Sequence, residues 1–129
     1  MERRPAQKFE DLIVWQKAHQ LTLRVYKVTK TFPREELFGL TAQMRKAATS
    51  VPANIAEGFS KQGRSDKARF MNTAQGSLEE LRYYFILSRD LGYIPPNLDW
   101  KDLDEVARLL GAYARTLRGS SPGFVAPRS

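Results

Sequence analysis

The sequence predicts an all-α protein, an antiparallel up-down bundle of four helices within one domain. Four successive segments carry apolar residues that recur at alternating steps of four and three, the spacing of a bundle helix. Short stretches that contain proline or glycine separate these segments, and helices joined by short connections become antiparallel neighbours. No segment shows the two-residue alternation of a half-buried strand. With 129 residues, of which 42% are hydrophobic, the chain is long enough to bury its own core.

The first predicted helix begins at Asp11, a good N-terminal cap, and runs to about Thr31. It ends at Phe32-Pro33, because a residue that precedes proline disfavours the helical conformation. We expect residues 1–10 to form a flexible N-terminal lead, residues 11–119 the bundle and residues 120–129 a flexible C-terminal tail. The apolar stripe of this helix consists of Val14, Ala18, Leu21, Val25, Val28 and Phe32.

The second predicted helix begins near residues 33–36 and contains Pro52. Its apolar stripe keeps its phase across the proline, which predicts one long helix kinked at Pro52; the alternative is a break, with Ser50 capping a new helix. Proline lacks the N–H that would bond the carbonyl of Ala48, and the hydroxyls of Thr49 and Ser50 are candidates to perturb or satisfy this turn. The stripe consists of Leu40, Met44, Ala47, Val51, Ile55 and Phe59.

A turn over residues 61–65 precedes the third predicted helix. Gly63 suits a left-handed helix terminator there, and Ser65 suits the N-terminal cap of the helix that follows. This helix is expected to end at Leu91-Gly92, because the two prolines that come next prevent it from resuming. Its stripe consists of Phe70 or Met71, Ala74, Leu78, Leu81, Phe85 and Ser88.

The fourth predicted helix begins near Asp99, or alternatively with a capping box formed by Asp102 and Glu105. It is expected to end at Gly119, since glycine commonly terminates helices. Its stripe consists of Leu103, Val106, Leu110, Tyr113 and Leu117.

The composition bears on where the protein acts. The chain has no cysteine, which excludes disulfides and thiolate metal sites and favours a reducing compartment. Residues 1–10 are polar and do not resemble a signal peptide, and no window approaches the roughly 20 apolar residues that span a membrane. We therefore expect a cytoplasmic protein.

No catalytic, cofactor or metal site is predicted. His19 is the only histidine, so the chain can form neither a His-rich zinc site nor the paired Glu-x-x-His motifs of a di-iron bundle. A hydrolytic triad would need His19 as its base, and this residue lies in the middle of the first predicted helix. The chain also has no Gly-x-x-x-x-Gly-Lys phosphate loop. The expectation is a protein without enzyme activity, cofactor or small-molecule substrate.

Gly58 and Gly76 lie inside predicted helices, where glycine costs about 0.5–1 kcal/mol relative to alanine. Close approach of two helices at Gly58 and Gly76 is the expected compensation. Polar residues spaced three apart stand beside both glycines. They predict a structural hydrogen-bonded network between the second and third helices; the alternative is that each residue faces water. The network residues are Asn54, Glu57, Ser77 and Glu80.

Positive charge is unevenly distributed along the chain. The formal net charge is +7, and residues 43–69 alone carry six basic residues against two acidic ones. A basic surface attracts polyanions, although a solvated surface that serves solubility explains the same charge. Tyr83 or Tyr84 could stack on bases if exposed, or belong to the core or an interface. The predicted nucleic-acid-binding residues are Arg45, Lys46, Lys61, Arg64, Lys67 and Arg69.

Several short motifs together resemble a known family, the bacterial four-helix-bundle proteins called 23S ribosomal RNA intervening-sequence proteins. The similarity runs from about Phe9 to Gly119. The most specific motif is the Asn-Ile-Ala-Glu-Gly run of residues 54–58 combined with Gly-Ser-x-x-Glu at residues 76–80. The other matching positions are residues 9–12, 14–18, 32–33, 36–40 and 91–93, together with Gln43, Arg45, Ala47, Ser50, Pro52, Ala74 and Leu81.

The resemblance implies a four-helix bundle that assembles as a homopentamer. It also implies a relationship to the accessory proteins of diversity-generating retroelements, which share this fold and bind a reverse transcriptase and nucleic acid. It supplies no catalytic residues.

Two functions follow as alternatives. The first is an oligomer that associates with RNA or DNA through its basic surface. The second is an oligomeric scaffold that binds a protein partner, such as a reverse transcriptase, with no direct role for nucleic acid.

Overall fold

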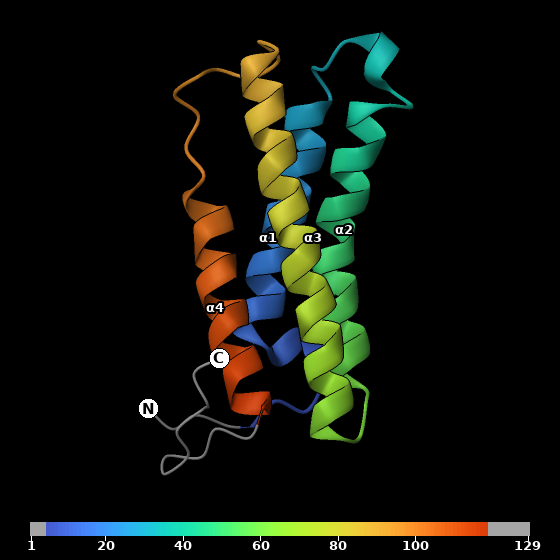
Figure 1. Ribbon diagram of the computed structural model, residues 1–129, viewed down its shortest axis with the longest axis vertical. Helices are drawn as coiled ribbons and strands as arrows, with labels where there is room; N and C mark the ends of the chain where they lie inside the picture. The colour runs from blue at the N-terminus through green and yellow to red at the C-terminus, as the bar shows by residue number, and fades with distance from the viewer. Residues whose placement is uncertain (1–4, 119–129) are drawn as a thin grey trace, which may run out of the picture.

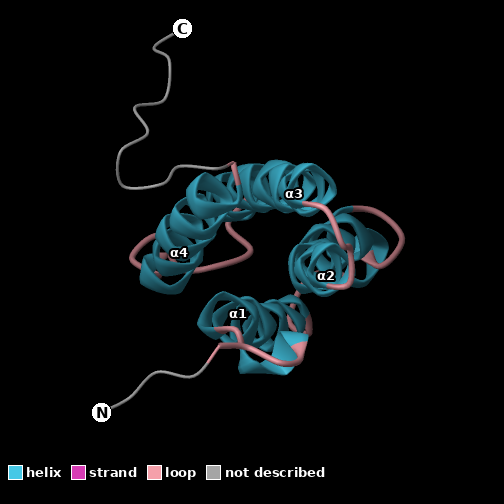
Figure 2. Cartoon of the chain, turned by 90° about the horizontal axis from the view of Figure 1, so that it is seen from below, coloured by secondary structure: helices cyan, strands magenta, loops and turns pink. Residues whose placement is uncertain are grey.

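The computed structural model describes residues 5–118, which form four antiparallel α-helices in an up-down bundle (Figure 1). The helices are α1 (Ile13–Thr29), α2 (Leu40–Phe59), α3 (Arg64–Asp90) and α4 (Lys101–Leu117), with short 3-10 helices η1 (Phe9–Asp11) and η2 (Arg34–Glu36) before α1 and α2. Seen along the bundle, each helix packs on its two neighbours, so that α1 and α3 lie on the diagonal (Figure 2). No strand occurs between residues 5 and 118. The predicted fold class is confirmed.

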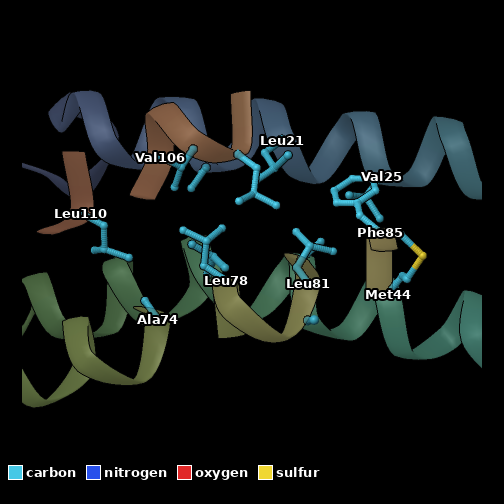
Figure 3. Packing of buried hydrophobic residues seen from close by; sticks show 14 of the residues in the cluster. Leu21, Val25, Met44, Ala74, Leu78, Leu81, Phe85, Val106 and Leu110 are labelled. Atoms are coloured by element: carbon cyan, nitrogen blue, oxygen red, sulfur yellow. The ribbon is translucent and has the colours of Figure 1, made fainter. Parts of the chain in front are cut away.

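The core lies where the four predicted apolar stripes meet. In Figure 3, Leu21 and Val25 of α1 point toward Leu78, Leu81 and Phe85 of α3. In α3 the buried member of the Phe70–Met71 alternative is Met71, while Phe70 is only partly covered. Four stripe residues are half-buried because they lie near the ends or edges of the bundle: Val28, Phe59, Tyr113 and Leu117. In α4 the buried position beside Tyr113 is taken by Ala114.

The helical start of the chain differs from the prediction. Asp11 belongs to η1 and does not cap α1, whose N-terminal cap is Leu12. The Asp11 carboxylate instead accepts hydrogen bonds from the backbone N–H groups of Gln7 and Lys8 at 3.0 and 3.2 Å, which lower its pKa. Phe9 packs edge-on against Trp15 with 5.1 Å between ring centroids. The predicted flexible lead is therefore structured at its end, whereas residues 1–4 and the predicted tail of residues 120–129 lie outside the described chain.

The start of α2 also differs, because residues 34–36 form a separate 3-10 helix and α2 begins only at Leu40. The cap residue, Gly39, has no side chain to offer the first backbone N–H groups. Glu36 takes this role: its Oε1 atom accepts a hydrogen bond from the N–H of Leu40 at 3.0 Å. Its Oε2 atom accepts one from the hydroxyl of Tyr93 at 2.9 Å, which ties the α1–α2 connection to the α3–α4 connection.

Glu36 is expected to make stability depend on pH. The hydrogen bond from Leu40, followed by that from Tyr93, lowers the pKa of Glu36 below its usual 4.5. The contribution of Glu36 is therefore present above pH 4.5 and is lost as the pH falls through the lower pKa of the folded state. Thermal unfolding between pH 3 and pH 7 should show a smaller loss at acid pH for Glu36→Gln than for the wild type. Glu35→Gln, at the exposed neighbouring position, should keep the wild-type profile; equal profiles for all three proteins would contradict the capping role.

Helix α2 continues through Pro52 without a break, and a neighbouring helix supplies the missing hydrogen bond. Proline has no N–H to donate to the carbonyl of Ala48. The hydroxyl of Thr22 in α1 lies 3.0 Å from that carbonyl oxygen and 2.9 Å from the carbonyl of Ala18 in its own helix. The alternative of a new helix capped by Ser50 is wrong. The hydroxyl of Thr49 bonds the carbonyls of Arg45 and Lys46, so it does not satisfy the carbonyl of Ala48, and whether it perturbs the turn stays a prediction. The kink itself stays a prediction.

The remaining helix ends fall close to the predicted positions, with different caps. Gly63 is the N-terminal cap of α3 with a φ of −88°, so it is not a left-handed terminator, and Ser65 lies inside the helix. The left-handed residue is Gly92, with a φ of +80°, just after α3. There the N–H of Tyr93 bonds the carbonyl of Ser88 at 2.9 Å and the N–H of Gly92 bonds that of Arg89 at 3.0 Å, which is a Schellman motif.

Helix α4 begins next to Asp99, as predicted, with Trp100 at the cap position. The carboxylate of Asp99 accepts a hydrogen bond from the N–H of Lys101 at 3.1 Å. The alternative capping box does not form, because both of its carboxylates bind α1: Asp102 pairs with Arg24, and Glu105 pairs with Lys17 at 3.6 Å.

Candidate nucleic-acid interface

The six predicted nucleic-acid-binding residues do not share one face. Arg45 and Lys46 lie in the middle of α2 and point to different neighbours. The Nε atom of Arg45 donates a hydrogen bond to the Thr29 hydroxyl at 2.8 Å, and its guanidinium lies 4.7 Å from the ring centroid of Tyr26. Arg45 is therefore half-buried and joins α2 to α1. Lys46 is exposed and borders a groove that faces α3.

The other four residues gather at the end of the bundle where α2 turns into α3. Three of them make local contacts. Lys61 pairs with Glu57 at 3.4 Å and Arg69 with Asp66 at 3.0 Å, while Nζ of Lys67 donates to the carbonyl of Phe59 at 2.6 Å. The two ion pairs are exposed and therefore weak, so these charges stay at the surface.

Arg64 differs from these three residues, because it has no ion-pair partner within residues 5–118. It lies in the first turn of α3, beside the end of α4, and the two helix ends meet at the lower end of the bundle in Figure 1. An open groove of about 580 Å³ runs between them. Its lining consists of Arg64, Ser65, Ala68, Leu117 and Arg118.

Arg118 and Arg115 were not among the predicted binding residues. Their positions near the end of α4 indicated only favourable interactions with the negative end of the helix. The up-down topology brings this end of α4 next to the start of α3, which a count of charge along the sequence does not show. We call the resulting surface the basic end; it carries six basic residues against the acidic Glu57 and Asp66. Its basic residues are Lys61, Arg64, Lys67, Arg69, Arg115 and Arg118.

Aromatic side chains accompany the basic end, but they are not the predicted tyrosines. The Nζ atoms of Lys67 and Lys61 lie 5.1 and 5.2 Å from the ring centroids of Phe59 and Phe70. The guanidinium of Arg69 lies 5.6 Å from the Phe70 centroid. Tyr83 and Tyr84 are far along α3, roughly 20 Å or more from the basic end at a rise of about 1.5 Å per residue. They do not form a common surface with these cations.

The predicted polar network is partly brought together between α2 and α3. The hydroxyls of Ser50 and Ser77 lie 2.7 Å apart, and the amide of Asn54 donates to the Ser50 carbonyl and hydroxyl at 2.8 and 2.9 Å. Ser50 is the central member, and the prediction did not include it. Glu80 reaches the hydroxyl of Tyr84 at 3.3 Å. Glu57 does not join, because it is exposed and faces Lys61.

Gly58 in α2 and Gly76 in α3 behave differently. A Cβ atom built on Gly58 would clash with Cε of Met71, lie 2.8 Å from Cβ of Phe70 and 3.3 Å from the carbonyl oxygen of Lys67. Gly58 therefore allows α2 to approach α3 closely, as predicted. Gly76 has no atom within 4 Å of such a Cβ, so the predicted close approach at this glycine is absent within the described chain.

Comparison with known proteins identifies the family. The sequence model of the 23S rRNA-intervening sequence protein family matches residues 10–112. The chain belongs to this family. A search of curated proteins found no match. Among solved structures, the chain is similar to a protein of the S23 ribosomal protein family from Bacteroides thetaiotaomicron, whose function is given as unknown. The TM-score is 0.58 at 22% sequence identity, over 83% of this chain and 96% of the other. This similarity supports the fold alone.

The family match ends before the last turn of α4, so Arg115 and Arg118 lie outside it. The residues that carry the resemblance most specifically lie between α2 and α3: Gly58, Ser77 and Glu80. The family match thus covers the helix packing but only part of the basic end.

Two further observations concern other classes of site. Over residues 5–118, no group of three or more His, Asp or Glu side chains is arranged to hold a metal ion. None of the four described helices has the length and apolar character needed to cross a membrane.

Proposed function

We propose that this protein is a non-enzymatic, cytoplasmic homo-oligomer, most simply a pentamer, that binds nucleic acid through phosphate contacts at its basic end. The observation that carries this proposal is the pair formed by Arg64 and Arg118, which line one open groove to which no carboxylate of residues 5–118 contributes. Guanidinium groups that pair with no carboxylate of the described chain can bind phosphate oxygens, often in a bidentate manner.

The remaining cations of the basic end support this function. Lys61 and Arg69 lie in exposed ion pairs, which are weak enough for a polyanion to compete for them, and Lys67 lies beside them. The proposed contacts are to phosphates and not to base edges. The binding would therefore be insensitive to nucleotide sequence. The proposal covers RNA and DNA alike, because both present the same phosphate oxygens. In an oligomer, several basic ends would bind one strand and increase the avidity.

Charge reversal at the groove should weaken binding uniformly across sequences. Fluorescence anisotropy with labelled single-stranded RNA, duplex RNA and DNA at several salt concentrations measures both affinity and its salt dependence. Contacts between six cations and a single strand give a slope of roughly −4 for log affinity against log salt. The double variant Arg64→Glu/Arg118→Glu should make this slope less steep by roughly 1.4, because two phosphate contacts are lost.

The matched control is Lys27→Glu/Lys30→Glu, which changes the net charge equally at exposed positions near the other end of the bundle. It should bind nearly as the wild type does. An equal loss in both double variants would show that only net charge matters and would contradict the assignment to the basic end. Absence of binding to all three nucleic acids at low salt would remove the nucleic-acid function altogether.

The second candidate is an oligomeric scaffold for a protein partner such as a reverse transcriptase. It is favoured by large apolar side chains that the protomer leaves exposed, among them Phe38, Tyr83 and Leu23. This function becomes the better account if nucleic acid does not bind.

A further inference from the structure

An apolar groove of about 530 Å³ lies where the start of α1 meets the end of α4, toward the lower end of the bundle in Figure 1. This volume is in the range of ligand-binding pockets, roughly 300–1,000 Å³. Its lining consists of Pro5, Ala6, residues 11–14, Leu109 and Tyr113. We call this site the α1–α4 groove.

Most of the lining of the α1–α4 groove is apolar, and part of it is exposed. The side chain of Ile13 is 56% exposed, and those of Leu109 and Tyr113 are half-buried. The lining also contains a carboxylate, that of Asp11, which accepts hydrogen bonds from two backbone N–H groups of the preceding segment. A surface of this composition favours an apolar occupant.

The chain itself carries an apolar segment within reach of the groove. Arg118 is the C-terminal cap of α4, and Phe124 follows six positions later. Six residues span at most roughly 20 Å at about 3.3 Å per residue. Back along α4, Tyr113 and Leu109 lie only about 7.5 and 13.5 Å from Arg118, at a rise of about 1.5 Å per residue. The linker is therefore long enough to turn back and bring Phe124 to the groove.

The position and the composition of this segment also suit the groove. Leu109, Tyr113 and Leu117 recur at steps of four, so they share one face of α4 that leads from the groove to the start of the segment. Residues 119–123 are glycine, serine and proline, and they include Pro122-Gly123, a pair typical of turns. Residues 124–127, Phe-Val-Ala-Pro, are all apolar, whereas residues 2–4, which precede the first lining residues, are all charged.

We propose that Phe124 and Val125 of the C-terminal segment dock in the α1–α4 groove of their own chain. The contact is intramolecular, so the short linker gives Phe124 an effective concentration on the order of millimolar at the groove. A weak apolar contact is then enough to keep the groove occupied for most of the time. Docking covers the exposed side chain of Ile13 and anchors the segment that the sequence alone predicts to be a flexible tail.

Cleavage by chymotrypsin after Phe124 in the full chain tests the docking. The protease needs the ring to leave the groove, so the rate follows the undocked population when docking and undocking are faster than cleavage. A synthetic peptide of residues 119–129 gives the rate for an unprotected Phe124. The wild-type chain should be cleaved at this bond about 5-fold more slowly than the peptide, or slower still.

Two substitutions on α1 separate the groove from the rest of the surface. Ile13→Glu places a charge in the lining, in the first turn of α1, where a carboxylate is favourable for the helix. It should raise the rate of cleavage after Phe124 to nearly that of the peptide. The matched control, Leu23→Glu, makes a similar change at a side chain that is 51% exposed, about 15 Å further along the helix at a rise of about 1.5 Å per residue. It should keep the wild-type rate, and circular dichroism checks that both variants retain their helices.

Cleavage of the wild-type chain at the rate of the peptide would overturn the docking. Equal acceleration in the two variants, or none in Ile13→Glu, would show that the protection does not depend on the groove and would overturn the proposal as well. The protection should not change when the protein is diluted. Protection that is lost on dilution would place the segment on a second copy and contradict docking within one chain.

Discussion

Replacing Gly58 with alanine should destabilise the protein by about 1–3 kcal/mol, the usual cost of forcing extra atoms into a packed core. The new methyl group would clash with the Met71 side chain and lie 2.8 Å from Cβ of Phe70. The end of the Met71 side chain can move, but Cβ of Phe70 and the carbonyl of Lys67, at 3.3 Å, belong to rigid parts of α3. Helices α2 and α3 would have to separate. Chemical denaturation measures the change in the free energy of unfolding.

The matched control is Gly76→Ala, at a glycine inside α3. Its added methyl group meets no atom within 4 Å, so it should stabilise the protomer by about 0.5–1 kcal/mol through helix propensity alone. Opposite signs for the two substitutions are the expected result. If Gly58→Ala were neutral or stabilising, α2 and α3 would not approach each other as closely as the structure indicates.

Replacing Thr22 with valine should cost about 1–3 kcal/mol, because it leaves the buried carbonyl of Ala48 without a donor. Valine has nearly the shape of threonine, so the packing between α1 and α2 is preserved and the hydrogen bond is the main loss. The same substitution should cost much less in a Pro52→Ala background. Alanine at position 52 restores a backbone N–H that can bond the carbonyl of Ala48 within α2.

A double-mutant cycle on Thr22→Val and Pro52→Ala isolates this coupling, with an expected interaction energy of about 1 kcal/mol or more. Thr29→Val is a useful reference, because the Thr29 hydroxyl is also buried but donates to carbonyls of its own helix, those of Val25 and Tyr26. It also accepts a hydrogen bond from Arg45 in α2, so the substitution has its own cost. It should show no coupling to Pro52→Ala. Additive effects of the Thr22 and Pro52 substitutions would contradict the role of Thr22 as the partner of Ala48.

The helices and their buried faces could be predicted from the sequence because a bundle core is encoded locally. The steps of four and three that link Val14 to Val25, or Leu78 to Phe85, define a face without reference to the other helices. The helix caps were harder to predict from the sequence than the buried faces. The cap of α2 comes from Glu36, four residues before the first helical residue, and the partner of the Ala48 carbonyl comes from another helix. Both depend on tertiary contacts that sequence spacing does not reveal.

The candidate interface was predicted only in part for the same reason. A basic run is visible in the sequence between Arg45 and Arg69. The sequence does not show which of these side chains bind other residues of the protein. Arg45 is held against Thr29 in α1. Arg64 meets Arg118 only because α4 ends beside the start of α3. Ser50 likewise becomes the centre of the polar network through Ser77, which is 27 positions away in the chain.

The most direct test of the account is to map where RNA touches the protein. Ultraviolet crosslinking of labelled single-stranded RNA to the wild-type protein, followed by peptide mass spectrometry, reports the contacted segments. Binding at the basic end predicts crosslinks within residues 57–70 and 113–118, the segments that form this surface. Crosslinks confined to α1, around Lys27 and Lys30, or to the exposed α2–α3 groove at Lys46 would contradict it.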